Sequence, residues 1–174
     1  MIECEYIHEG DFEFEAGGSV SGLKVVYHRS ERGWQKDDDR KVIWICHALT
    51  ANSDAEDWWP ELVGPGRLFD TEKYFVVCAN MLGSAYGSSG PSSIDPATGK
   101  PYYFDFPKIT VRDIVRANDL VRQHLGIECI DFMVGGSIGG FQSLEWSVIR
   151  LHSRGSTRVP NTSRGAPFPP PSSR

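Results

Sequence analysis

The chain has 174 residues, of which 40% are hydrophobic and 11% aromatic, which is enough for one domain with a sizeable core. All 23 acidic residues precede residue 150, so the body of the protein is acidic, and this argues against nucleic acid as its partner. The longest apolar runs are too short to cross a bilayer, and the N-terminus lacks the basic start of a signal peptide. We therefore expect a soluble, cytoplasmic protein with no membrane partner.

The first predicted elements are strands. Residues 12–15 alternate between apolar and polar side chains, a Gly-containing segment follows, and residues 23–28 extend again, which predicts two antiparallel strands. Residues 41–46 and 73–78 are continuous apolar runs without alternation. This pattern is typical of strands in a parallel sheet that is covered on both faces.

Residues 81–109 form a long Gly-, Ser- and Pro-rich segment, which is a candidate wall of a binding site, with a disordered insertion as the alternative. A helix and a strand–helix unit follow it. Thr110 and Asp113 form the pattern of a capping box, and apolar residues then recur at helical spacing until Gly126. Residues 130–134 predict a third buried strand. That strand runs through a Gly-rich turn into another helix, as in a βα unit.

The sequence divides into residues 1–149, which we expect to form the folded domain, and residues 150–174. The second segment has five arginines and no acid, is rich in Ser and Pro, and cannot bury a core, so we expect an irregular, disordered tail. Its composition suits a polyproline ligand or a basic tail. Because it begins abruptly in a helical pattern, we interpret it instead as a frame-shifted or otherwise unnatural terminus.

Cysteines and histidines give little sign of a metal site. The four cysteines form no Cys-x-x-Cys pair and three lie in or beside strand-like runs, which favours buried thiols over disulfides or metal ligands. No two histidines have metal-ligand spacing. We therefore expect no metal.

The candidate chemistry centres on Ser137, within the sequence Gly135-Gly136-Ser137-Ile138-Gly139. This G-x-S-x-G pattern lies between a buried strand and a helix, where a sharp turn exposes a nucleophilic serine. The backbone N–H of Ile138 is then placed to stabilise an oxyanion, and we choose the N–H of Leu49, in the loop after the first buried strand, as the second donor. A purely structural Gly-rich turn is the alternative.

His47 begins that loop and precedes Ser137 in the chain. In folds with a nucleophile elbow the general base follows the serine. We therefore interpret His47 as a hydrogen-bonding residue that orients the loop.

Five sequence blocks, taken together, resemble the homoserine O-acetyltransferase family in content and order. They are His47-Ala48-Leu49-Thr50, residues 58–66, residues 80–84, residues 87–91, and residues 135–140. The resemblance covers about residues 10–149 and does not extend into the Arg- and Pro-rich segment. It implies the N-terminal half of an α/β-hydrolase fold, an α/β architecture with a mostly parallel sheet flanked by helices.

The resemblance also implies an activity. Members of the family transfer an acetyl group from acetyl-CoA, as co-substrate rather than bound cofactor, to the hydroxyl of L-homoserine in methionine biosynthesis. By match, Ser137 is the nucleophile, and Leu49 and Ile138 supply the oxyanion-hole N–H groups. Homodimerisation is typical of the family. The residues present do not distinguish acetyl-CoA from succinyl-CoA as the donor.

The sequence departs from the family after Ser137. Family members complete the triad with an Asp and a His downstream, whereas here no aspartate follows the serine, and the one histidine is His152. Because an unassisted serine is a poor nucleophile, we expect this chain to be inactive or nearly so alone. A serine esterase of the same fold, and a non-catalytic binding module that uses the tail or the sheet edge, are the alternatives.

Overall fold

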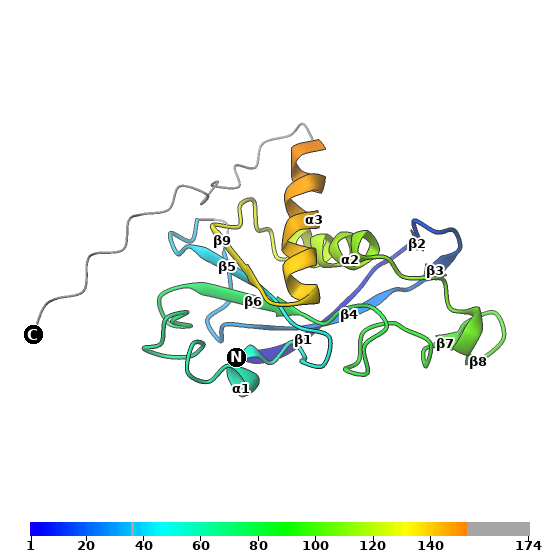
Figure 1. Ribbon diagram of the computed structural model, residues 1–174, viewed down its shortest axis with the longest axis horizontal. Helices are drawn as coiled ribbons and strands as arrows, with labels where there is room; N and C mark the ends of the chain where they lie inside the picture. The colour runs from blue at the N-terminus through cyan, green and yellow to red at the C-terminus, as the bar shows by residue number, and fades with distance from the viewer. Residues whose placement is uncertain (36, 153–174) are drawn as a thin grey trace, which may run out of the picture.

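The computed structural model describes residues 1–35 and 37–152, and it places a five-stranded mixed sheet at the centre (Figure 1). In spatial order the strands are β1 (Ile2–Ile7), β4 (Lys24–Arg29), β6 (Phe75–Ala79), β5 (Val42–Cys46) and β9 (Phe132–Gly135). The β1–β4 and β4–β6 pairs are antiparallel, whereas β5 lies parallel to both β6 and β9. The three parallel strands therefore end at the same edge of the sheet.

The two central strands are buried along their whole length, as the continuous apolar runs predict. Successive side chains point to opposite faces of a strand. Val42, Trp44 and Cys46 accordingly pack in the core that includes α2 (Val111–His124) and α3 (Ile138–His152), while Ile43 and Ile45 pack with α1 (Ala55–Trp58). Both faces of β5 and β6 are thus covered, whereas β9, which was predicted as a third buried strand, contains no buried residue.

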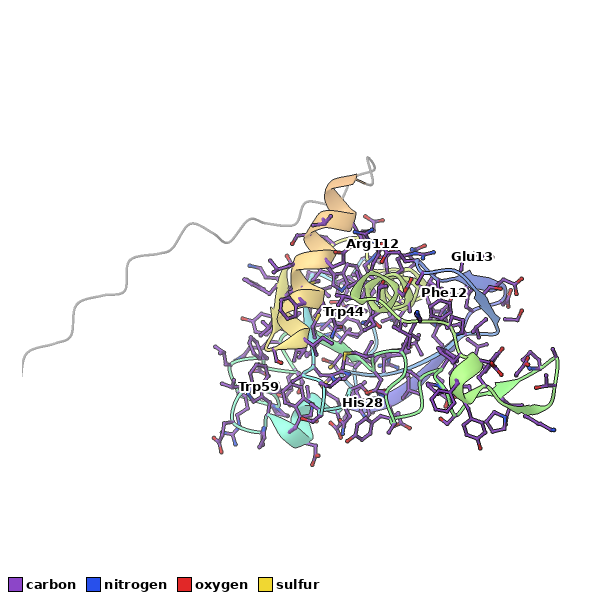
Figure 2. All side chains as sticks on the ribbon, turned by 45° about the vertical axis from the view of Figure 1, so that its right-hand side comes forward. Phe12, Glu13, His28, Trp44, Trp59 and Arg112 are labelled. Carbon is purple, nitrogen blue, oxygen red and sulfur yellow. The ribbon has the colours of Figure 1, made fainter. Side chains whose placement is uncertain are left out.

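Aromatic side chains pack in both core layers, one on each face of the sheet. Figure 2 shows Trp44 beneath α3 and Trp59 beside α1, on opposite sides of the sheet. The ring of Trp44 packs edge-on against Trp146 of α3, with 5.5 Å between the ring centroids. This contact packs α3 against β5.

The helix α2 begins and ends as predicted. The Thr110 hydroxyl accepts a hydrogen bond from the Asp113 N–H, and the Asp113 carboxylate accepts one from the Thr110 N–H, which completes the capping box. Gly126, just past the helix, has a φ of 69°, a conformation that glycine adopts without strain.

The opening strands pair differently from the simplest expectation. Residues 12–15 contribute to β2 (Asp11–Glu13), which forms a hairpin with β3 (Ser19–Ser21), whereas β4 pairs with β1 and β6. The segment β1 has an alternating pattern of its own, which the prediction did not use. The five-residue connection between β2 and β3 closes the hairpin locally, so β4 remains available to join the main sheet.

The long segment after β6 contains short elements: β7 (Ile94–Asp95), β8 (Lys100–Pro101) and the 3-10 helix η1 (Tyr103–Asp105). The helix α3 continues to His152, so the predicted boundary at residue 150 falls inside it. The rest of the predicted tail, residues 153–174, lies outside the described residues. Within the described part of the chain, no helix has the length and apolar character needed to cross a membrane.

Candidate active site

The candidate site lies where the parallel strands β5 and β9 end. Cys46 is paired with Gly135 in the strand register, so the chain segments that follow these two residues leave the sheet side by side. Ser137 is two residues beyond one strand and His47 is the first residue beyond the other. The carboxyl edge of a parallel sheet is the usual location of binding and catalytic residues in such folds.

Ser137 occupies a strained turn between β9 and α3. Its φ is 57°, in the left-handed region that non-glycine residues rarely adopt, and its side chain is exposed. Such strain persists only where the surrounding structure enforces it, and it concentrates at functional sites. The turn therefore presents the Ser137 hydroxyl to solvent at the start of a helix.

Two of the four glycines around Ser137 are required by packing. A Cβ on Gly135 would collide with the carbonyl oxygen of Gly139, and a Cβ on Gly139 would collide with the carbonyl oxygen of Cys46. At Gly136 an added Cβ would meet nothing within 4 Å. The close approach of strand and helix thus explains glycine at positions −2 and +2 from the serine, and it leaves position −1 sterically open.

The first turn of α3 contains a backbone N–H group that has no backbone acceptor among the described residues. The N–H groups of Gly139 and Gly140 donate to the carbonyl oxygens of Gly136 and Ser137, both at 2.9 Å. The Ile138 N–H has no such backbone partner within residues 1–35 and 37–152. The N-terminus of a helix also carries a partial positive charge, which favours a developing oxyanion.

Leu49 lies in a tight turn just beyond β5. The Ala51 N–H donates to the carbonyl oxygen of Ala48 at 3.0 Å, so Leu49 is the second residue of a four-residue turn. The closing hydrogen bond of such a turn leaves the N–H of the second residue unused, and the described residues provide no backbone partner for it. The Leu49 side chain is 67% exposed, which places this turn at the surface.

His47 is fully buried beneath the turn and makes two hydrogen bonds. Its Nε2 lies 3.2 Å from the Met81 nitrogen and its Nδ1 lies 2.8 Å from the Ala48 carbonyl oxygen. Because the Met81 N–H donates, Nε2 must accept, and Nδ1 carries the proton and donates to Ala48. Burial lowers the pKa of His47, since it disfavours the charged imidazolium.

Polar residues beyond the predicted set also fix the loops of the site. The Asn80 side chain, just after β6, accepts a hydrogen bond from the Ser53 N–H at 2.7 Å and donates to the carbonyl oxygen of Tyr86 at 2.8 Å. The Gln142 Nε2 on α3 donates to the His47 carbonyl oxygen at a long 3.5 Å. A polar residue directly after a buried strand, such as Asn80, was the available sequence signal for this role.

Within the described part of α3, the structure shows no contact between an acidic side chain and Ser137. Glu145 accepts a hydrogen bond from the Arg112 Nε at 2.6 Å and so faces α2.

Burial raises the pKa of the Cys46 thiol to about 12, so this neighbour of the site is an unreactive thiol at neutral pH. The described residues contain no cluster of His, Cys, Asp or Glu suited to a metal ion.

The profile of the alpha/beta hydrolase fold matches residues 41–150, which is more than half of the chain and includes β5, β6, β9 and the serine turn. The chain therefore belongs to the alpha/beta-hydrolase fold family. Within that family it is similar to homoserine O-acetyltransferases. The one from Cyclobacterium marinum is 55% identical over 146 residues, 84% of this chain and 41% of the relative.

A second homoserine O-acetyltransferase, from Nostoc punctiforme, is 46% identical over 138 residues, 79% of this chain and 38% of the relative. The chain thus spans less than half the length of these curated relatives. Within this shared region, the sequence similarity confirms the resemblance to the family that the five sequence blocks indicated.

Solved structures give the same fold and two activities. The homoserine O-acetyltransferase from Bacillus anthracis has a TM-score of 0.75 and 30% identity, covering 87% of this chain and 44% of that structure. The esterase E22 also has a TM-score of 0.75 and 30% identity, covering 84% of this chain and 43% of its own. The backbone alone therefore does not separate acyl transfer to an alcohol from hydrolysis.

Proposed function

We propose that this chain is the nucleophile-bearing part of an acyltransferase that moves an acetyl group from acetyl-CoA to the hydroxyl of L-homoserine, in the service of methionine biosynthesis. The observation that carries the proposal is the strained, exposed Ser137 at the junction of β9 and α3, with φ of 57°. The sequence similarity to homoserine O-acetyltransferases supports homoserine as the acceptor and acetyl as the transferred group.

In the proposed first step, the Ser137 oxygen attacks the thioester carbonyl of acetyl-CoA. A bond forms between this oxygen and the carbonyl carbon, the carbon–sulfur bond breaks, and the CoA thiolate takes up a proton equivalent to the one that the serine loses. In the second step the homoserine hydroxyl oxygen attacks the carbonyl carbon of the acetyl-serine, the ester bond to Ser137 breaks, and acetylhomoserine is released, while the proton lost by the homoserine hydroxyl balances the one that Ser137 regains. This is ping-pong covalent catalysis, with acetyl-CoA as co-substrate and no bound cofactor.

The negative charge that develops on the carbonyl oxygen needs donors. We assign this role to the N–H groups of Leu49, the second residue of the turn after β5, and of Ile138, the first residue of α3. One such donor is typically worth about 3 kcal/mol of transition-state stabilisation.

The serine also needs a base, and His47 is unsuited to that task because both of its ring nitrogens are engaged with the backbone. No aspartate follows Ser137 in the sequence. Losing the base of a triad lowers the rate by orders of magnitude. We therefore propose that the chain by itself acylates slowly and turns over acetyl-CoA and homoserine poorly or not at all.

Mass spectrometry of the purified chain tests the proposed nucleophile. After incubation with acetyl-CoA, or with the more reactive 4-nitrophenyl acetate, we expect one acetyl group on the peptide that contains Ser137. Ser137→Ala should abolish it, whereas Ser147→Ala, an exposed serine on the same helix, should leave it unchanged. Acetylation of the Ser137→Ala protein at the same rate as the unmodified protein would contradict the proposal. Turnover of homoserine by the chain alone would contradict its expected inactivity.

A serine esterase is the second candidate, because the esterase E22 matches this backbone as well as the B. anthracis transferase does. Water and a hydroxyl acceptor share the same serine and oxyanion donors. Competition between water and homoserine for the acetylated Ser137 distinguishes an esterase from a transferase. Faster loss of the acetyl group with added homoserine, and formation of acetylhomoserine, support the transferase, whereas a rate of loss that is independent of homoserine supports the esterase.

A further inference from the structure

The end of β5 is held tightly against the helix that carries the nucleophile. A Cβ on Gly139 would collide with the Cys46 carbonyl oxygen and lie 3.0 Å from the carbonyl oxygen of His47. The Gln142 side chain, one turn further along α3, reaches the same His47 carbonyl. The backbone at residues 46–47 therefore cannot shift without moving the first turn of α3.

The His47 imidazole extends this rigid point in two directions. Its Nε2 accepts from the Met81 N–H, in the segment that follows β6. Its Nδ1–H donates to the carbonyl oxygen of the next residue, Ala48. One fully buried side chain thereby joins the ends of two strands to the loop that leads to Leu49.

The Ala48 carbonyl oxygen is shared between two donors. It accepts from the His47 Nδ1–H at 2.8 Å and from the Ala51 N–H at 3.0 Å. The second bond closes the turn, and the first fixes the direction of the carbonyl about which the turn is built. Because the Ala48 carbonyl and the Leu49 N–H belong to the same planar peptide unit, fixing one also fixes the other.

We propose that His47 is a positioning residue that holds the Ala48–Leu49 peptide in the orientation needed to stabilise the oxyanion at Ser137. This inference rests on the proposed function, since it concerns one of the two oxyanion donors. It assigns His47 no contact with substrate and no proton transfer. A purely structural His47 would contribute to folding stability without setting the orientation of this peptide.

Two substitutions separate the two hydrogen bonds of His47. In His47→Asn the side-chain amide nitrogen can replace Nδ1 as a donor to Ala48, but nothing reaches Met81. In His47→Gln the longer side chain can replace Nε2 as an acceptor for Met81, but the donor to Ala48 is lost. His124→Gln, at an exposed position on α2, is the matched control.

Nuclear magnetic resonance of the full chain tests the proposal without requiring turnover. In the unmodified protein, the imidazole ¹⁵N shifts should show the neutral tautomer with the proton on Nδ1. In His47→Gln, the order parameter of the Leu49 amide should fall from about 0.85 to below about 0.6, whereas His47→Asn and the control should keep it high. A proton on Nε2 in the unmodified protein, or an ordered Leu49 amide in His47→Gln, would overturn the proposal.

The acylation rate of Ser137 by 4-nitrophenyl acetate gives the functional readout. Loss of one oxyanion donor lowers rates by roughly 10²–10³-fold, so a misoriented donor should lower the His47→Gln rate by at least about 10-fold, with partial rescue in His47→Asn. Equal rates in His47→Gln and the control would also count against positioning. If Ser137 is not acylated in the unmodified protein, the proposed function fails, while the tautomer and Leu49 order still decide the role of His47.

Discussion

At the scale of single residues, the turn around Ser137 depends on two glycines for reasons that the structure makes specific. Gly139 allows α3 to approach the carbonyl oxygen of Cys46, and Gly135 leaves room for the carbonyl oxygen of Gly139, whereas Gly136 borders open space. The sequence pattern marks all of these glycines alike. The structure separates those that packing requires from those that it does not.

Alanine substitutions at Gly139 and Gly136 should therefore have different effects on stability. Gly139→Ala should lower the free energy of unfolding by about 1–3 kcal/mol or more, because the new methyl group overlaps backbone atoms. Gly136→Ala should be neutral or raise it by roughly 0.4–1 kcal/mol, because alanine reduces the freedom of the unfolded chain. Urea unfolding of both proteins measures the difference. Equal destabilisation by the two substitutions would show that the packing is not as described.

The buried His47 should make the protein less stable in acid. Its pKa is lowered in the folded state by burial, so the unfolded chain binds this proton more readily than the folded chain. The stability that the neutral His47 contributes is fully present above pH 6.5, the ordinary histidine pKa. It is lost as the pH falls from there toward the lower pKa of His47 in the folded state. Cys46 and Cys78, which flank His47, have raised pKa values and remain uncharged in this range.

Thermal unfolding between pH 7.5 and 5 measures this effect for the unmodified protein and for His47→Gln. The unmodified protein should lose stability as the pH falls, and the variant, which lacks the titrating group, should lose less. Parallel pH profiles for the two proteins would show that His47 does not titrate as the burial argument requires.

Residue-level prediction from sequence succeeded where the signal is local. The G-x-S-x-G pattern located the strained turn at Ser137, although the roles of Leu49 and Ile138 as donors remain proposals. The contacts that fix the loops could not be predicted in the same way. His47 meets Met81 34 residues away, and Gln142 reaches His47 across 95 residues, which no local pattern specifies.

At the scale of elements, α2 has the most complete local specification. Thr110 and Asp113 close the capping box, and the fully buried Asp113 also accepts a hydrogen bond from the Glu15 N–H at 2.9 Å. One helix terminus thereby anchors the segment after β2. Because the capping box itself lies within residues 110–113, the helix could be predicted from residues 110–126 alone.

Removing the cap tests that specification. Thr110→Ala should lower the free energy of unfolding by about 0.5–2 kcal/mol, because the Asp113 N–H loses its acceptor. Thr98→Ala, in an exposed loop, should change it by less than about 0.5 kcal/mol. Urea denaturation gives both values. Indistinguishable stabilities would mean that the cap contributes nothing measurable.

The strands show where prediction from sequence stops. β5 and β6 were predicted because burial on both faces leaves a continuous apolar run, whereas the pairing of β4 with β1 and β6 depends on contacts between distant segments. The three-residue β2 and β3 form their own hairpin. Local patterns identified most strands of the sheet but not the order in which they pair.

At the scale of the whole molecule, one end of the sheet is apolar and uncovered by the described residues. The strand β9 is an edge strand, and the nearby α3 exposes a stripe of side chains: Phe141 is 63% exposed, Leu144 is 66% exposed, and Val148 is 41% exposed. Exposed edges and apolar patches promote association between chains. The esterase and transferase structures that match this fold are more than twice as long as the matched region.

This surface should make the chain self-associate. Phe141→Gln combined with Leu144→Gln should lower the apparent mass in light scattering at a given protein concentration, with little loss of secondary structure. Ser92→Gln together with Ser147→Gln, at exposed polar positions, is the control. Unchanged association in the first pair would exclude this face of α3 as its cause.

We propose that this chain supplies the nucleophile and the oxyanion donors of a homoserine acetyltransferase. Reconstitution tests it most directly: the chain is mixed with the part of the Cyclobacterium marinum enzyme that lies beyond the region of similarity, and homoserine-dependent release of CoA is measured. We predict activity that appears only in the mixture and is lost with Ser137→Ala but not with Ser147→Ala. Activity that survives Ser137→Ala, or a stable complex of the two polypeptides without any activity, would contradict the claim.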